Sequence, residues 1–343
     1  PATYDSAVKA EETVKQIVAT SGRLASTENG LTNSLTSIKQ TVTNDLNNEG
    51  LKALAPEVAK LEKQIAEITT AKEAAKKQAD AAVLDVGKAF LQASQDSLDY
   101  VAKHLDPKDA AEAVNTKRLL DISESSADKA KYLFSDDRNS YYRNLNPNPN
   151  MVNEFNQAKA ISAQTEGFSS IIKGNTDSSE AAEGAKTLGP VDTADTNRSD
   201  PNSYLYKYDS VSGKYRSAIS NYRDATNNID PNSEIGKIAT RRLNECEKQY
   251  AEIQKTYNDG VIESAAKNAK ALYAEAQNPD AQESPRILYQ RVSAQLDLLT
   301  RSLNAIQAKE PQKYDSVNKE FAAMITDVGT QMQRFRLMRA YAL

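Results

Sequence analysis

The feature that most constrains the fold is a heptad pattern in a stretch of almost fifty residues without an internal proline. It runs from Pro56 to about Lys103, with two neighbouring rows of apolar residues. One row is Leu54, Leu61, Ile68, Ala75 and Ala82, and the other includes Val58, Ile65 and Val86. Apolar residues spaced by seven form a seam along one side of a helix, so this stretch predicts one long helix that pairs with another. Such a helix is about 75 Å long at about 1.5 Å per residue.

A second heptad pattern precedes the first. Its seam residues are Ile17, Leu24, Leu31 and Ile38, with Leu35 and Val42 in the adjacent row. The pattern crosses Asn29-Gly30, where we expect the helix to bend or break. Because the chain supplies long partner helices of its own, we expect these seams to be satisfied in an intramolecular bundle, with a free coiled-coil dimer as the alternative.

Prolines mark the starts of further helices. Asp106-Pro107, Asp230-Pro231, Ser284-Pro285 and Glu310-Pro311 are typical of a helix start with proline in the first turn. Between these marks, helices are predicted at 107–134, 150–173, 202–228, 232–277, 285–308 and 312–341. No segment alternates with period two, so the predicted fold is all-α, with long antiparallel helices in coiled-coil-like bundles and no sheet.

Two polar stretches divide the chain. Residues 135–150 contain two prolines and five asparagines, and residues 174–201 are rich in Gly, Ser, Thr and Asp. The predicted domains are a long-helix coiled-coil-like bundle at 1–134 and a helical bundle at 202–343. Between them, 135–201 is predicted to hold a loop, a short helix and a flexible linker.

The composition argues against catalysis and against nucleic acid as a partner. With 43 basic and 47 acidic residues, the net charge of −4 gives no basic footprint. Cys246 and His104 are the only residues of their kinds, which excludes an internal disulfide and a thiolate zinc site. Cys246 is interpreted as a buried thiol, and His104 as a residue that suits the end of a helix. Glycine-rich phosphate loops and the G-x-S-x-G motif are absent, and DTADTN at 192–197 lacks the glycine and closing Glu of a calcium loop. We therefore expect no catalytic residue, cofactor or metal.

Tyrosine is the unusual residue, with 16 copies in a chain that has no Trp. Tyrosine is favoured at recognition surfaces because it combines a rigid apolar ring with a polar hydroxyl. The candidate partner-binding tyrosines are Tyr141, Tyr142, Tyr204 and Tyr206. The heptad row of Tyr208, Tyr215 and Tyr222 is better interpreted as core filler, with a recognition surface as the alternative.

Three arginines are further candidates for partner binding. Arg334, Arg336 and Arg339 alternate with apolar residues in the segment RFRLMRAYAL. A basic amphipathic helix of this kind contacts an anionic membrane or an acidic protein, although solvated arginines on an ordinary helix end are the favoured interpretation. The chain has no run of 18 apolar residues, so no membrane-spanning helix is predicted.

The segment Leu288–Phe335 resembles the C-terminal helical domains of chlamydial type III-secreted effector proteins. The similarity lies in a helix pair joined across Lys309-Glu310-Pro311-Gln312, followed by Phe321-Ala322-Ala323. It covers about fifty residues. The resemblance implies secretion into host cytosol or the bacterial inclusion and binding of host trafficking proteins, and it implies no catalytic residues.

The sequence favours a non-enzymatic, secreted bacterial effector or virulence protein that binds host proteins through helical surfaces. The alternative is an assembly component, such as a secretion-apparatus tip or translocator protein or a coiled-coil scaffold. The first residues contain no apolar signal segment, so secretion without a signal peptide, to host cytosol or the bacterial surface, is the expected route. A cytoplasmic location is the alternative. A pore-forming toxin and an enzyme are disfavoured, and the oligomeric state stays open.

Overall fold

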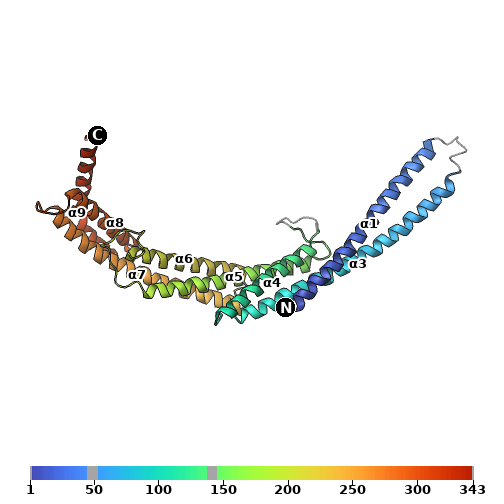
Figure 1. Cartoon of the computed structure of the whole chain (residues 1–343), viewed down its shortest axis with the longest axis horizontal. Coiled ribbons are helices and arrows are strands. Elements are labelled where there is room, and N and C mark those ends of the chain that lie inside the picture. The colour runs from blue at the N-terminus through green and yellow to red at the C-terminus, as the bar shows by residue number, and fades with distance from the viewer. Residues whose placement is uncertain (1, 45–52, 137–144, 342–343) are drawn as a thin grey trace. The chain divides into compact units, whose positions relative to one another are not determined.

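The computed structural model describes residues 2–44, 53–136 and 145–341, and these form eight helices and no strand (Figure 1). The all-α prediction is confirmed. The helices are α1 (Ala2–Asn44), α3 (Ala55–Ala102), α4 (Ala110–Leu133), α5 (Val152–Lys186), α6 (Tyr204–Asn228), α7 (Glu234–Ala276), α8 (Pro285–Ile306) and α9 (Pro311–Tyr341). The chain forms two compact units, unit 1 at Pro1–Ser169 and unit 2 at Ser170–Leu343.

In unit 1, α1 and α3 pack along each other as the antiparallel hairpin that the two heptad patterns predict (Figure 1). Leu24, Leu31, Leu61 and Ile68 are half-buried along its seam. The break expected at Asn29-Gly30 is wrong, because α1 continues to Asn44. A glycine inside a helix costs about 1 kcal/mol, and seam contacts on both sides of Gly30 offset that cost.

The core of unit 1 lies where the second half of α3 meets α4 and the start of α5. Its packing depends on small polar residues. The buried Ser94 hydroxyl donates to the Ser123 carbonyl at 2.8 Å, and the Ser123 hydroxyl lies 2.9 Å from that of Thr165. The buried ring of Phe134 packs against Gly87, where a Cβ would lie only 2.4 Å from it. Asp109 caps α4, three residues beyond the Asp106 expected from the sequence.

Helix α5 is much longer than predicted and overturns the flexible linker expected at 174–201. It ends at Lys186 instead of 173, and its residues divide between the two units. In unit 2 the Tyr222 ring packs against Gly174, and Asp177 accepts a hydrogen bond from Ser217 at 2.6 Å. These contacts with α6 stabilise a polar, glycine-containing segment as helix, although its composition alone favours a loop.

Unit 2 is built on α6, α7, α8 and α9. Helix α7 packs against both α6 and α8, and α9 packs against α8. One apolar cluster joins α7, α8 and α9 and includes Leu288, Val292, Leu299 and Phe321. A second cluster joins the end of α5 to α6 and α7 and contains Tyr215, Tyr222 and Cys246. Tyr208, Tyr215 and Tyr222 are all buried, so the core-filler interpretation of this row is confirmed.

Serine side chains cap the helices of unit 2. Ser203, Ser233 and Ser284 accept hydrogen bonds from the backbone N–H groups of Tyr206, Gly236 and Ile287 at the starts of α6, α7 and α8. The predicted start of α8 at Ser284-Pro285 is confirmed. Helix α7 begins at Glu234, three residues after Pro231, with Ser233 as its cap. Each cap satisfies an N–H group that has no partner within its helix.

Candidate functional site

The segment 187–203, which we name the strap, connects α5 to α6 and is anchored on α7 and α8. It leaves α5 through Gly189, whose φ of 65° suits glycine. Two residues later, Val191 fills the space above Gly260 of α7, where a Cβ would lie 2.3 Å from its Cγ2 atom. The close approach of the two segments therefore requires a glycine at position 260.

Thr193 locks the strap into the bundle. Its side chain is fully buried, and its hydroxyl donates to Gln295 Oε1 at 2.8 Å and accepts from Asn268 Nδ2 at 3.1 Å. Its backbone N–H donates to the Ser264 hydroxyl at 3.1 Å, and its carbonyl accepts from Gln295 Nε2 at 2.5 Å. All these polar atoms are satisfied inside the bundle, so the strap has one defined position.

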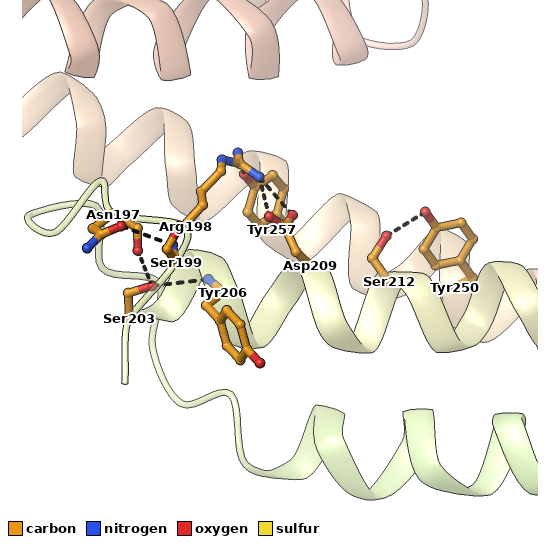
Figure 2. A network of polar contacts seen from close by, with 9 residues as sticks. All are labelled: Asn197, Arg198, Ser199, Ser203, Tyr206, Asp209, Ser212, Tyr250 and Tyr257. Atoms are coloured by element: carbon orange, nitrogen blue, oxygen red, sulfur yellow. Dashed lines mark hydrogen bonds and ion pairs between the residues drawn. The ribbon is translucent and has the colours of Figure 1, made fainter. Parts of the chain in front are cut away.

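The second half of the strap is held on α6 and α7 by an ion pair (Figure 2). The Arg198 guanidinium donates to both carboxylate oxygens of Asp209 on α6, at 2.8 and 2.6 Å, and lies 3.5 Å from the Tyr257 hydroxyl of α7. The Ser203 hydroxyl donates to the Asn197 carbonyl at 2.8 Å and also caps α6. The strap and the first turn of α6 thus form one hydrogen-bonded structure.

Tyrosines stack beneath this junction. The Tyr208 and Tyr257 rings are parallel, with centroids 3.6 Å apart, and Tyr204 stacks on Tyr257 at 6.4 Å. Further along, Tyr250 stacks on Tyr215 at 5.8 Å, and its hydroxyl lies 2.9 Å from that of Ser212. The stacked rings therefore pack the first half of α6 tightly against α7.

The electrostatics of this junction do not favour acid–base chemistry. Burial raises the pKa of the Tyr257 hydroxyl, and burial together with the Tyr257 hydroxyl raises that of Tyr204. Burial also raises the pKa of the Cys246 thiol. These groups therefore stay protonated at neutral pH and act as hydrogen-bonding and packing groups, not as bases or nucleophiles.

The predicted partner-binding residues fall into three places. Tyr204 is half-buried, and Tyr206 is 41% exposed, with its ring pointing away from Arg198 and Tyr257 (Figure 2). Arg334 and Arg336 are exposed on α9. The prediction for Tyr141 and Tyr142 lies outside the described residues, as do the side chains of Arg339 and Val42.

The structure brings Tyr204 and Tyr206 together at the strap but does not join them to the arginines. Among the described residues, no hydrogen bond, ion pair or ring contact links either tyrosine to Arg334 or Arg336. The candidate residues therefore make up two separate surfaces of unit 2, one at the strap and one on α9.

A groove of about 870 Å³ lies beside the strap, with α7 as its floor. Pro190 and Val191 of the strap and Ile262 of α7 supply its apolar lining. Its charges are mixed: Lys313 of α9 pairs with Asp259 at 2.6 Å, and Glu263 and Lys267 are exposed. Most of the lining residues are polar, and a lining with charges of both signs suits a peptide segment better than a small anion.

The single histidine and cysteine have structural surroundings. His104 stacks on Tyr100 with a centroid distance of 3.9 Å, and its Nδ1 lies 2.7 Å from the Tyr100 carbonyl at the end of α3. Cys246 is 2% exposed in the second apolar cluster. In the part of the chain that the structure describes, no cluster of three metal-ligating side chains occurs, and no helix is long and apolar enough to span a membrane.

Sequence reasoning missed the residues that hold the strap, namely Val191, Thr193, Arg198 and Asp209. A usable signal existed for the tyrosines alone. Tyr208 and Tyr215 on α6 and Tyr250 and Tyr257 on α7 share the same sevenfold spacing, which indicates that the two rows face each other. Nothing in the local sequence marks Thr193, since its partners Ser264 and Gln295 lie 71 and 102 residues away.

Comparison with protein family models, with curated proteins and with solved structures finds no match to this chain.

Proposed function

We propose that this chain is a non-enzymatic, secreted bacterial effector that binds a host protein through the strap surface of unit 2. The observation that carries the proposal is the exposed Tyr206 ring in the first turn of α6, a turn that hydrogen bonds and ring stacking hold in place. Tyr206 follows the Ser203 cap, and the tyrosine stack and the Arg198–Asp209 ion pair hold the same turn of α6.

A rigid, exposed tyrosine loses little conformational entropy when it binds, which is why such residues contribute strongly to protein interfaces. The groove beside the first half of the strap offers polar groups, charges of both signs and a few apolar side chains for a peptide segment of the partner. The resemblance of Leu288–Phe335 to chlamydial type III-secreted effectors supports a host protein as the partner and secretion into host cytosol or the bacterial inclusion.

Site-specific photocrosslinking tests the proposal. The full chain carries a benzophenone amino acid in place of Tyr206, and for comparison in place of Val114, which is 69% exposed on α4 of unit 1. Both proteins are incubated with eukaryotic cytosol and with bacterial lysate. We expect a discrete adduct with eukaryotic cytosol from position 206 alone, and unlabelled chain should compete it away while Tyr206→Arg chain should not.

Adducts that form equally from both positions, or equally in both lysates, would contradict a host-protein site at the strap. Failure of the unlabelled chain to compete would have the same meaning, because it would show that the adduct does not report a saturable surface.

A structural or assembly component is the second candidate, and the α1–α3 hairpin supports it. The exposed Ile38 and Leu54 lie in the rows of the two seams, at the end of the hairpin farthest from the core of unit 1. Light scattering with size-exclusion chromatography separates the candidates. A monomer over a wide concentration range favours the effector, and a stable oligomer that Ile38→Glu dissociates favours the assembly component.

A further inference from the structure

The last part of α9 is longer than its packing partner. Helix α8 has 22 residues and α9 has 31, and the two pack as an antiparallel pair. Counting 22 residues from Pro311 reaches Met332, so the following residues of α9 pass the start of α8. The contacts agree, because Phe335 still touches Tyr289 in the first turns of α8, with ring centroids 6.0 Å apart.

Burial changes along α9 at the same point. Phe321 and Val328 are buried against α8, Met332 and Phe335 are half-buried, and then Leu337 and Met338 are each 58% exposed. Among the described side chains of α9, Leu337 and Met338 are the only two adjacent large apolar residues that are exposed to this extent. The residues 333–338, which we name the basic segment, thus present apolar surface away from the bundle.

The charge of this region has one sign. From Val328 to Tyr341 the sequence contains three arginines and no Asp or Glu. Arg334 and Arg336 are exposed, and neither makes an ion pair or a hydrogen bond with the described residues. Arg334, Leu337 and Met338 have the spacing i, i+3 and i+4, so they share one face of the helix. Arg336 lies about 160° around the helix axis from Arg334, outside that face.

We propose that the basic segment of α9 binds the surface of membranes that contain anionic lipid. Guanidinium groups bind lipid phosphates and carboxylates at the level of the headgroups, and the neighbouring apolar side chains insert just below them. Each basic residue near such a surface contributes about fivefold to binding. This proposal does not depend on the protein-binding site at the strap.

Charge and chemistry disfavour the other occupants of this surface. A second copy that paired through the same segment would bring like charges together, since the segment contains arginines and no carboxylates. An acidic protein surface would pair with the arginines but would leave Leu337 and Met338 in water. A lipid headgroup layer satisfies both kinds of side chain without a matching shape.

Vesicle co-sedimentation of the full chain tests the proposal. One set of vesicles is pure phosphatidylcholine, and in the other about a third of the lipid is phosphatidylserine. We expect binding to the anionic vesicles alone, with an affinity that falls as salt is added. Arg334→Glu should lower the affinity at least about fivefold, since a favourable charge beside the apolar face becomes repulsive, and Arg336→Glu should lower it less. Leu337→Ser with Met338→Ser should weaken binding but keep its salt dependence.

A matched control exists on α4, where the exposed Val114, Lys117 and Arg118 lie among carboxylates. The triple variant Val114→Ser, Lys117→Glu and Arg118→Glu should bind anionic vesicles as the unchanged chain does. Circular dichroism shows whether each variant keeps its helices.

Three outcomes overturn the proposal. They are no binding to either vesicle, equal binding to both, or an equal loss in the α4 control. If the chain bound soluble polyglutamate at concentrations at which it did not bind anionic vesicles, the proposal would be overturned in favour of an acidic protein partner.

Discussion

At the scale of single residues, the close packing of the long helices and of the strap depends on glycines at the contact points. The Phe134 ring, the Tyr222 ring and the Val191 side chain each fill the space above a glycine, at Gly87, Gly174 and Gly260 respectively. A cavity-free fit of this kind leaves no room for even one methyl group unless its neighbour moves.

Gly260→Ala tests this dependence at the strap. The new Cβ would lie 2.3 Å from Val191 Cγ2, so we expect the strap to shift and the free energy of unfolding to fall by about 1–3 kcal/mol. Urea denaturation of the full chain measures the change. Adding Val191→Ala should recover part of the loss, because it removes the clashing methyl groups.

Gly329→Ala on α9 is the control for that experiment, since nothing lies within 4 Å of the added Cβ. It should raise stability by about 0.5–1 kcal/mol through helix propensity alone. If the substitutions at 260 and 329 had the same effect, the contact between Val191 and Gly260 would carry no energetic weight.

At the scale of elements, the strap shows how a polar segment without regular structure becomes ordered. Its order comes from Val191 packed above Gly260, from the buried hydroxyl of Thr193 and from the Arg198–Asp209 ion pair. The ion pair is exposed and contributes little stability on its own. The buried network around Thr193 therefore carries most of the polar stabilisation.

Thr193→Val removes the hydroxyl while it keeps the shape of the side chain. Gln295 Oε1 and Asn268 Nδ2 then lose a partner inside the bundle, which costs about 1–3 kcal/mol. We expect faster hydrogen exchange across residues 187–203 and faster proteolytic cleavage there. Thr196→Val, at an exposed position of the same strap, should change neither rate. Unchanged protection in the Thr193 variant would show that the strap is held by other contacts.

At the scale of the whole molecule, the two units differ in how they build their cores. Unit 1 uses a two-helix hairpin and small hydroxyl residues such as Ser94, Ser123 and Thr165. Unit 2 uses tyrosines. Among the residues that the structure describes, the tyrosines with a raised pKa all lie in unit 2: Tyr204, Tyr208, Tyr215, Tyr257, Tyr273 and Tyr289. Burial is the main cause in each case.

Alkaline pH should therefore unfold unit 2. A tyrosine in the unfolded chain has a pKa of about 10, and burial together with Asp327 raises the pKa of Tyr273 to about 12. Below about pH 10 these hydroxyls are neutral in both states, and above it the unfolded state loses protons first. The stability of unit 2 is then lost progressively between about pH 10 and the higher pKa values of the folded state. The last part of the rise in tyrosinate absorbance should coincide with the loss of the helical circular dichroism signal. Completion of that rise while the helical signal is unchanged would contradict this.

Much of the architecture was predictable because heptad spacing is local. The pattern of Leu61, Ile68 and Ala75 specified a long helix and its seam, and Ser284-Pro285 specified the start of α8. Of the candidate site, Tyr206 was found by its residue type alone. The residues that support it were not, because their partners are distant in the chain.

The sequence by itself determined the helical class, the seams and most helix ends, since periodicity and capping act within one or two turns. The tertiary structure decided the rest. It continued α1 through Gly30 and extended α5 to Lys186, and it turned the expected flexible linker into an anchored strap. These features depend on contacts between residues far apart in sequence, such as Thr193 with Gln295, which form only when the bundle has brought the helices together.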